Sequence, residues 1–274
     1  MKSDPQQSTA LRVLALHKRY VRRSAPWQTS TEVLAVNGVD LEIVAGRTMA
    51  LVGNSGSGKS TIARCVTRLE QPDSGEIWLG QTEISKLSDR DLRPMRSQIQ
   101  MIFQDPATSL NPRFSAAEAI EEPLLIQKRG TRGWRRERAE ELMNEVGLSP
   151  KWADRNVMNF SGGQRQRIAI ARALAMQPKI LVLDEAFSAL DLSTQAQIAN
   201  LLLQLQSAHS LTYLLISHNL ALVAAIADTM AVISKGKIVE QGNTSEVVAQ
   251  PRHPETRKLL VYPFGVAAIA GATR

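Results

Sequence analysis

The sequence predicts an α/β protein with a mostly parallel sheet, an antiparallel β part near the N-terminus and an inserted helical part. From Thr48 onward, short apolar runs alternate with longer helical ones, the pattern of strands joined by crossover helices. Two strand-like runs separated by a polar loop precede this alternation. Between Asp105 and Pro178 the pattern is helical only. Together these observations define the expected fold class.

Each expected element follows from its own local pattern. The early strands are expected at residues 11–16 and 33–43, on either side of the polar loop 22–31. Later strands are expected in the apolar runs TMALV, IQMIF, KILVL and TYLLIS. Helices are expected at 60–69, 194–206 and 220–227 in the alternating part, and at 116–127, 134–146 and 163–176 in the helical part.

The chain is long enough for more than one structural unit. Its 274 residues are about 1.8 times a typical domain of roughly 150. We expect a flexible N-terminus, an α/β core made of two sequence segments, a helical subdomain between them and a C-terminal extension. The corresponding boundaries are 1–10, 11–104 with 178–250, 105–177 and 251–274.

The composition indicates a folded chain without a disulfide framework. Apolar residues make up 43% and charged residues 22%, close to the averages for globular proteins. The single cysteine, Cys65, excludes an internal disulfide and any metal site built on several cysteines, and a small buried side chain explains it better than a redox switch. A net charge of +7 favours anionic partners such as nucleotides, nucleic acids or lipid headgroups without choosing among them.

Neither a membrane-spanning segment nor a nucleic-acid site is expected from the sequence. The apolar stretch 211–233 is interrupted by His218, Asn219 and Asp228, whereas a span needs about 20 mostly apolar residues, so no transmembrane helix is expected. The N-terminus lacks the apolar run of a secretory signal. The basic run 129–138 alternates with acidic residues and Trp134, which favours a solvated helix face over a nucleic-acid or lipid site.

The strongest chemical motif is a phosphate-binding loop between the run TMALV and a helical run. The sequence GNSGSGKS fits G-x-x-x-x-G-K-[ST], and its context makes an ordinary Gly/Ser turn a poor alternative. Its backbone N–H groups would surround phosphate oxygens, Lys59 would face the β and γ groups, and Ser60 would ligate magnesium. The predicted contacts are Gly53, Asn54, Ser55, Gly56, Ser57, Gly58, Lys59, Ser60 and Thr61.

Two carboxylates follow the buried run KILVL. Adjacent charges at the end of a buried strand repel each other unless a cation or a different protonation resolves them. Asp184 is therefore placed to hold magnesium, directly or through water, and Glu185 to polarise the water that attacks the γ-phosphate. The alternative, a solvated strand-end pair, is disfavoured because a phosphate loop is already present.

Polar groups also follow the runs IQMIF and TYLLIS. Gln104 and His218 stand at these ends, and each taken alone is as well explained by a structural role. Open parallel sheets bind ligands outside the carboxyl ends of their strands. We therefore expect Gln104 and His218 to join the phosphate loop and the carboxylate pair around one pocket, with Gln104 also near the magnesium.

A second anion-binding motif precedes the helical run RQRIAIARALAM. A serine and two glycines at a helix start expose N–H donors, although a simple N-cap is an alternative. Together with the phosphate loop and the strand-end groups, Ser161, Gly162, Gly163 and Gln164 resemble the signature of the ATP-binding cassette family, the nucleotide-binding subunits of membrane transporters. The resemblance covers roughly residues 11–250 and implies a P-loop NTPase core that binds ATP and Mg²⁺.

The resemblance implies roles for particular residues of this chain. It implies a head-to-tail dimer in which the signature of one subunit closes over the γ-phosphate held by the other, with Asp191 in the dimer-spanning loop and Tyr20 stacked on adenine; ordinary core packing is the alternative for Tyr20. Two positions depart from the family pattern. Phe160 replaces the leucine of LSGGQ, and Ala186 stands where proline is commoner.

A finer resemblance is to importers of oligopeptides, dipeptides and nickel. It rests on the stretch 103–112, FQDPATSLNP, and on the tail 253–260, HPETRKLL. Some relatives hold an iron–sulfur cluster in a cysteine-bearing C-terminal region, and this chain lacks those cysteines, so no cluster is expected. The carried solute is not specified by these stretches.

The function expected from these observations is ATP hydrolysis that powers an importer. The implied partners are two membrane permeases, a second cassette, and indirectly an external solute-binding protein, with the chain at the cytoplasmic face of the membrane and no nucleic acid bound. One rival is a soluble cassette in DNA repair or translation, which usually has zinc cysteines, a long coiled coil or two fused cassettes. A poorly hydrolysing gating cassette is a second rival, disfavoured by the presence of Gln104, Glu185 and His218.

Overall fold

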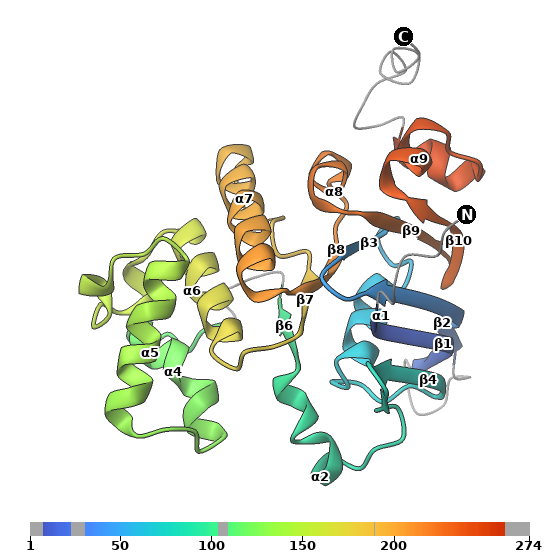
Figure 1. Ribbon diagram of the computed structural model, residues 1–274. Helices are drawn as coiled ribbons and strands as arrows, with labels where there is room; N and C mark the ends of the chain where they lie inside the picture. Colours follow the sequence, from blue (N-terminus) through green and yellow to red (C-terminus); the bar gives the residue numbers. More distant parts are fainter. Residues whose placement is uncertain (1–7, 23–30, 104–108, 189, 261–274) are drawn as a thin grey trace. The chain divides into compact units, whose positions relative to one another are not determined.

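The computed structural model describes residues 8–22, 31–103, 109–188 and 190–260 (Figure 1). Packing divides the chain into two compact units, one formed by residues 1–93 with 212–274 and the other by residues 94–211. The α/β fold class with a mostly parallel sheet, an antiparallel β part and a helical part is confirmed. Within the described residues, no helix has both the length and the apolar character needed to cross a membrane.

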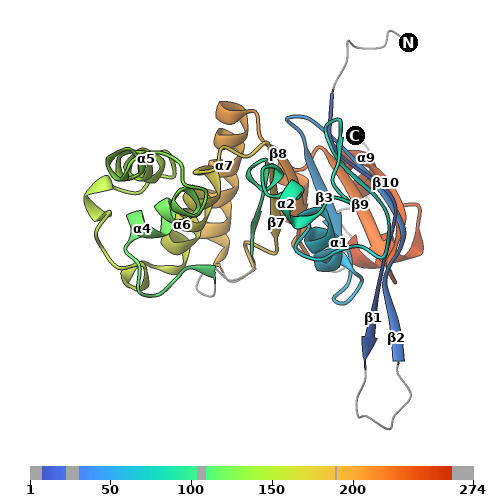
Figure 2. The same ribbon diagram turned by 90° about the horizontal axis from the view of Figure 1, so that it is seen from below.

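The first unit contains an antiparallel sheet in the order β2-β1-β4-β5. Its strands are β1 (Thr9–Arg22), β2 (Thr31–Val44), β4 (Ser74–Leu79) and β5 (Thr82–Glu83). Strands β1 and β2 are longer than the sequence predicted and form an extended two-stranded ribbon (Figure 2). The outer part of the ribbon lacks a core, because Val21 and Val33, where the second predicted strand begins, are both exposed.

The first unit also holds four neighbouring strands in the order β10-β9-β3-β8. Strand β3 (Thr48–Val52) is parallel to both β8 (Thr212–Ile216) and β9 (Thr229–Ser234), while β10 (Lys237–Asn243) is antiparallel to β9. All residues of β3 and β8 are buried, which explains their continuous apolar runs. The unit's helices are α1 (Lys59–Val66), α2 (Asp89–Leu92), α8 (Leu220–Ile226) and α9 (Thr244–Ala249).

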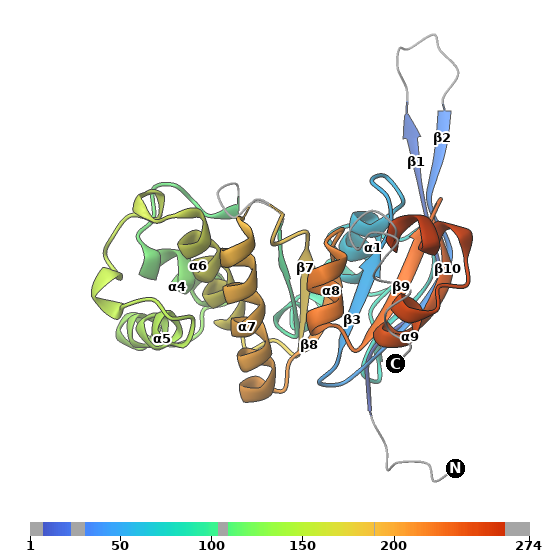
Figure 3. The same ribbon diagram turned by 90° about the horizontal axis from the view of Figure 1, so that it is seen from above.

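The second unit combines a parallel strand pair with the helical part of the chain (Figure 3). Strand β6 (Ile99–Ile102) pairs with β7 (Ile180–Asp184), and helices α4, α5 and α6 pack on one another. Their apolar faces meet in a core that includes Ile120, Leu124, Leu142 and Ile168. The unit's helices are α4 (Ala116–Ile126), α5 (Arg132–Glu145), α6 (Gly162–Leu174) and α7 (Leu192–His209), with 3-10 turns at Met95–Ser97, Pro150–Trp152 and Val157–Asn159.

Most of the basic run lies in α5, which begins at Arg132, while Arg129 precedes the helix. Arg136 forms ion pairs with Glu140 and Asp154, at 2.7 and 2.8 Å, and Arg138 contacts Glu141 at 2.8 Å. Acidic neighbours therefore balance the charges of Arg136 and Arg138. Cys65 likewise behaves as a core residue, because burial raises the pKa of its thiol to about 12 and keeps it protonated.

Asp228, a charged residue that interrupts an otherwise apolar stretch, has a structural role. Its Oδ2 accepts a hydrogen bond from the N–H of Thr48 at 2.8 Å, and its Oδ1 pairs with the Arg47 guanidinium at the same distance. Thr48 is fully buried, so its N–H depends on this partner. The carboxylate thus joins the start of β3 to the start of β9.

We expect Asp228→Ala to lower the free energy of unfolding by about 1–3 kcal/mol, because the buried Thr48 N–H loses its acceptor. Arg47→Ala is the matched control, since it removes only the exposed ion pair and should cost about 1 kcal/mol or less. Urea unfolding measures both values. Equal costs for the two variants would contradict the role given to the Thr48 hydrogen bond.

Candidate nucleotide-binding site

The phosphate loop leaves the buried strand β3 and enters α1 through glycines that no other residue replaces easily. Gly58 has a φ of 111°, and a Cβ atom there would lie 2.3 Å from the carbonyl oxygen of Ala35. A Cβ atom at Gly53 would lie 2.3 Å from the carbonyl oxygen of Ile233. The backbone therefore approaches two neighbouring segments too closely for side chains at Gly53 and Gly58.

Lys59 is buried inside the loop that it follows. Only 5% of the residue is exposed, and Nζ donates to the carbonyl oxygens of Gly53 at 2.8 Å and Asn54 at 2.9 Å. A buried ammonium is retained only where acceptors or anions compensate for lost water. These contacts hold the ammonium against the backbone of the loop.

A buried hydroxyl supports the fit of the loop to an anionic ligand. Ser57 Oγ has no hydrogen-bond partner in the structure, although the backbone N–H of Gly236 donates to the Ser57 carbonyl at 3.0 Å. Buried polar atoms without a partner are rare in proteins and need a reason. A phosphate oxygen beside the loop would accept a hydrogen bond from this hydroxyl, so the residues present fit a phosphate chain.

His218 lies beside the beginning of the phosphate loop. Leu51 of β3 pairs with Ile216 of β8 in parallel register, and Gly53 and His218 each follow two residues later. The side chain of His218 is exposed at this end of β8, while Ser217 before it is buried. The first unit therefore brings the loop and His218 together, as the sequence predicts for parallel strands.

Tyr20 approaches the phosphate loop from the antiparallel sheet. It lies near the end of β1, where it pairs with Val33, and its side chain is half-buried. The phenol interacts with the hydroxyl of Thr61, in the first turn of α1, and donates a hydrogen bond to Glu70. The ring is thus adjacent to the start of α1 and is not a member of the apolar core.

The second unit carries the carboxylate pair. Asp184 is the last residue of β7 and is buried, while Glu185 follows it with a φ of 46° and is partly exposed. The Glu185 carbonyl accepts bonds from the N–H and the hydroxyl of Ser188. The two adjacent carboxylate residues therefore differ in exposure, which suits separate roles. Gln104, predicted to follow β6, lies outside the described residues.

The second predicted anion-binding motif, Ser161 to Gln164, forms the start of α6. Ser161 caps α6: its Oγ accepts from the N–H of Gln164 at 3.3 Å, and Gln164 Oε1 accepts from the Ser161 N–H at 3.0 Å. The predicted N-cap is therefore present. The cap does not use the N–H groups of Gly162 and Gly163, which lack helical acceptors at this position. Capping and anion binding are compatible here.

Asp191 begins α7 and is coupled to the same motif. Both of its carboxylate oxygens accept bonds from Thr194, at 2.9 Å from the N–H and 2.7 Å from the hydroxyl. These bonds lower the pKa of Asp191, with the backbone bond as the largest cause. Thr194 in turn lies so close to Gly163 that a Cβ atom there would be 2.6 Å from Thr194 Cγ2.

Neighbouring side chains explain why Phe160 can replace the leucine of the family signature. Its side chain is buried, with its ring centroid 6.2 Å from that of Trp152 in an edge-on contact. The Arg155 guanidinium lies 4.9 Å from the centroid of the same ring. An aromatic residue at this position is therefore stabilised by its own neighbours and anchors the start of α6.

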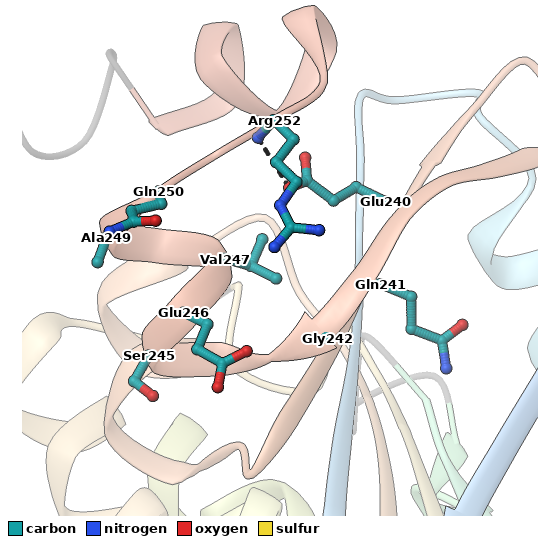
Figure 4. A pocket seen from close by; sticks show the side chains of 9 residues that line it. All are labelled: Glu240, Gln241, Gly242, Ser245, Glu246, Val247, Ala249, Gln250 and Arg252. Atoms are coloured by element: carbon teal, nitrogen blue, oxygen red, sulfur yellow. Dashed lines mark hydrogen bonds between the residues drawn. The ribbon is translucent and has the colours of Figure 1, made fainter.

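One open concavity lies apart from these residues. It has a volume of about 400 Å³ and lies between β10, α9 and Arg252 (Figure 4). Glu240 accepts a hydrogen bond from the Arg252 N–H at 2.8 Å and another from the His253 N–H at 2.9 Å. The bonds from the N–H groups of Arg252 and His253 lower the pKa of Glu240 against the opposing effect of burial, which is the largest influence. None of the lining residues belongs to the predicted nucleotide site.

Comparison with known proteins defines the class of this fold and site. Residues 36–188 match the ABC transporter family model, and the chain belongs to that family. It is therefore an ATP-binding cassette, a P-loop protein that binds and hydrolyses ATP.

More particular similarities come from curated relatives. The chain is 44% identical to the di/tripeptide transport ATP-binding protein DppF of Pseudomonas aeruginosa, over 92% of this chain and 78% of that protein. It is 49% identical to the probable D,D-dipeptide transport ATP-binding protein DdpF of Escherichia coli, over 85% of this chain and 71% of that protein.

Solved structures show the same fold. A dimeric post-hydrolysis state of the ATP-binding cassette MJ0796, bound to ADP and Pi, superposes with a TM-score of 0.76 at 29% identity, covering 85% of this chain and 98% of the other. The Clostridium perfringens protein cbiO1, part of the ABC transporter complex cbiONQ, gives a TM-score of 0.77 at 27% identity, covering 89% and 92%.

We expect Lys59→Ala to weaken ATP binding about ten- to a hundredfold, because a charged hydrogen-bond donor to the β and γ phosphates is lost while the backbone loop remains. Isothermal titration with ATP measures the change. Lys86→Ala, which removes an exposed lysine paired with Glu83, is the control and should leave the affinity unchanged. Unaltered affinity in Lys59→Ala would contradict the assignment of the loop.

We expect Gly162→Asp to fold normally and to lose hydrolysis, because its Cβ would meet only Leu190 Cδ2 at 3.7 Å while the added charge repels an approaching phosphate. Gly163→Ala is the structural contrast, since its Cβ would clash with Thr194 and lower stability. Thermal unfolding and ATP turnover, measured on both variants, separate the effects. A folding defect in Gly162→Asp as large as that in Gly163→Ala would contradict this distinction.

Proposed function

We propose that the chain is the ATP-hydrolysing subunit of a peptide importer. The observation that carries the proposal is the combination of an intact phosphate loop, carboxylate pair and signature with 44–49% identity to transport proteins for dipeptides and tripeptides. The stretch 103–112 and the tail 253–260 point to the same branch. Nickel-type solutes are the alternative cargo within that branch.

The phosphates of ATP would be held by the first unit. The backbone of residues 53–61 surrounds the phosphate chain, Lys59 contacts the β and γ groups, and Tyr20 stacks on the adenine. His218, at the adjacent strand end, would donate to the γ-phosphate. The buried Ser57 hydroxyl and the close glycine contacts support this assignment.

Hydrolysis would depend on the second unit. Glu185 accepts the proton of the attacking water, because its carboxylate is partly exposed beside the buried Asp184. Gln104 would sense the γ-phosphate and join the sheet to the helical subdomain, proposed at residues 105–177 within an α/β core of 11–104 and 178–250. Occupancy of the nucleotide site then changes the position of that subdomain.

Mg²⁺ fits the oxygen donors that these elements provide. The Ser60 hydroxyl and the carboxylate of Asp184 are hard ligands, and Mg²⁺ commonly combines one or two such groups with phosphates and water. When bound, it would neutralise charge on the transferred phosphate.

Two cassettes are needed in the proposed cycle. Ser161, Gly162, Gly163 and Gln164 of one subunit close over the γ-phosphate held by the other, and Asp191 lies in the loop between the sites. The N–H groups at the start of α6 support this assignment, because a helix N-terminus attracts anions. The second cassette is either a copy of this chain or a related one.

The remaining partners follow from the importer role. Two permease subunits would hold the dimer at the cytoplasmic face of the membrane, and an external binding protein would deliver the solute. The helical subdomain would receive the permease. The single cysteine supports a cassette without an iron–sulfur cluster. A role in DNA repair or translation is disfavoured because the relatives carry transport names.

The test is ATP hydrolysis by the chain reconstituted with its permeases in liposomes. Dipeptide- or tripeptide-loaded binding protein should stimulate hydrolysis, and Glu185→Gln should bind ATP, accumulate as a dimer and lose about a hundredfold or more in turnover. Stimulation by nickel alone would shift the cargo to the alternative. Stimulation of the isolated chain by DNA, with no response to peptide, would contradict the importer role.

A further inference from the structure

The ring of Tyr20 is held by a residue outside every recognised motif. Its phenol donates a hydrogen bond to Oε2 of Glu70, a residue in the segment that follows α1. The other carboxylate oxygen of Glu70, Oε1, lies 3.2 Å from the guanidinium of Arg64 within α1. Glu70 is therefore fixed to the helix that begins at the phosphate loop, and Tyr20 is fixed to Glu70.

The neighbouring backbone is fastened to the same segment. The Arg19 N–H donates to Asp73 Oδ2 at 2.6 Å, and Lys18 Nζ donates to the Gln71 carbonyl at 2.8 Å. The Lys18 ammonium also lies 5.7 Å from the centroid of the Tyr20 ring and covers one of its faces. A base stacked on Tyr20 would therefore use the opposite face.

Apolar packing does not supply this restraint. Tyr20 pairs with Val33, and both Val33 and the adjacent Val21 are exposed, so the outer part of the β1–β2 ribbon has no core around it. A side chain in such a place retains rotamer freedom unless polar contacts remove it. Burial and the bond to Glu70 raise the pKa of Tyr20, with burial as the larger cause, so the phenol remains a donor at neutral pH.

We propose that Glu70 is a positioning residue for adenine recognition: it orients the ring of Tyr20 so that the ring is ready to stack on the base of a bound adenine nucleotide. The inference rests on the role proposed above for Tyr20. Glu70 touches no part of the nucleotide. Its effect passes through the phenol, and it lowers the entropy lost when the base binds.

A positioning role makes a prediction that a general structural role does not. Inorganic tripolyphosphate resembles the phosphate chain of ATP and has no base. Loss of the Glu70 contact should therefore weaken ATP binding and leave tripolyphosphate binding unchanged. Tripolyphosphate also reports whether each variant retains a folded phosphate loop.

The experiment measures both affinities by isothermal titration of the full chain with Mg²⁺ present. Glu70→Ala should weaken ATP binding about three- to tenfold, the size of one hydrogen bond, and Tyr20→Ala about tenfold or more. Glu70→Gln keeps an acceptor for the phenol and should change ATP binding less than twofold. Glu32→Ala is the matched control, because Glu32 is an exposed carboxylate on the same ribbon and pairs with Arg19.

Two further variants test the route of the effect. Tyr20→Phe keeps the ring and removes the phenol, so it should weaken ATP binding as much as Glu70→Ala. The double variant Tyr20→Phe with Glu70→Ala should be no weaker than either single change. Arg64→Gln removes the ion pair that fixes Glu70 but leaves the Tyr20 contact, so it should weaken ATP binding by a smaller factor than Glu70→Ala.

The outcomes separate this inference from the proposed function. A normal ATP affinity in Glu70→Ala beside a weakened Tyr20→Ala would overturn the role of Glu70 and leave Tyr20 as the adenine contact. An equal loss for ATP and tripolyphosphate in Glu70→Ala would reduce Glu70 to a structural residue. Full ATP affinity in Tyr20→Ala would overturn both the aromatic role and the inference, without affecting the phosphate-loop assignment tested by Lys59.

Discussion

The site depends on how closely the phosphate loop packs against the backbone of two other segments. Gly58 approaches the carbonyl of Ala35 in β2, and Gly53 approaches the carbonyl of Ile233 in β9. The Gly236 N–H donates to the Ser57 carbonyl, and the Asn37 N–H donates to the carbonyl of Gly236. Backbone contacts with β2 and with the end of β9 therefore set the shape of the loop.

Local patterns were enough to predict the features that depend on local sequence. The loop Gly53–Ser60, the cap at Ser161 and the buried strands each occupy a short stretch, so spacing and periodicity identify them. The contacts of Asp228 with Thr48, and of Glu70 with Tyr20, join residues 180 and 50 positions apart. No periodicity encodes such pairs, because each of these residue types is ordinary for its own position at a strand start or after a helix.

The length of the β1–β2 ribbon is a second feature that local sequence patterns did not predict. The sequence predicted the parts of these strands that alternate between core and solvent, near Leu11 to Leu16. The strands continue beyond that region because backbone pairing persists where no apolar side chain is buried. Backbone pairing along the ribbon therefore sets the register of Tyr20 with Val33. The orientation of the Tyr20 ring depends instead on polar contacts of its side chain.

Two helix caps meet at the signature motif, and they use only some of its polar atoms. The cap employs Ser161 Oγ as an acceptor, so that bond does not use the proton of the hydroxyl. Asp191 uses both carboxylate oxygens on Thr194, which in turn faces Gly163. Asp191 thus acts on the signature by fixing Thr194, and the absence of a side chain at Gly163 is what allows α7 to begin so close to α6. The side chains of Ser161 and Asp191 thus cap two neighbouring helices whose starts meet at Gly163.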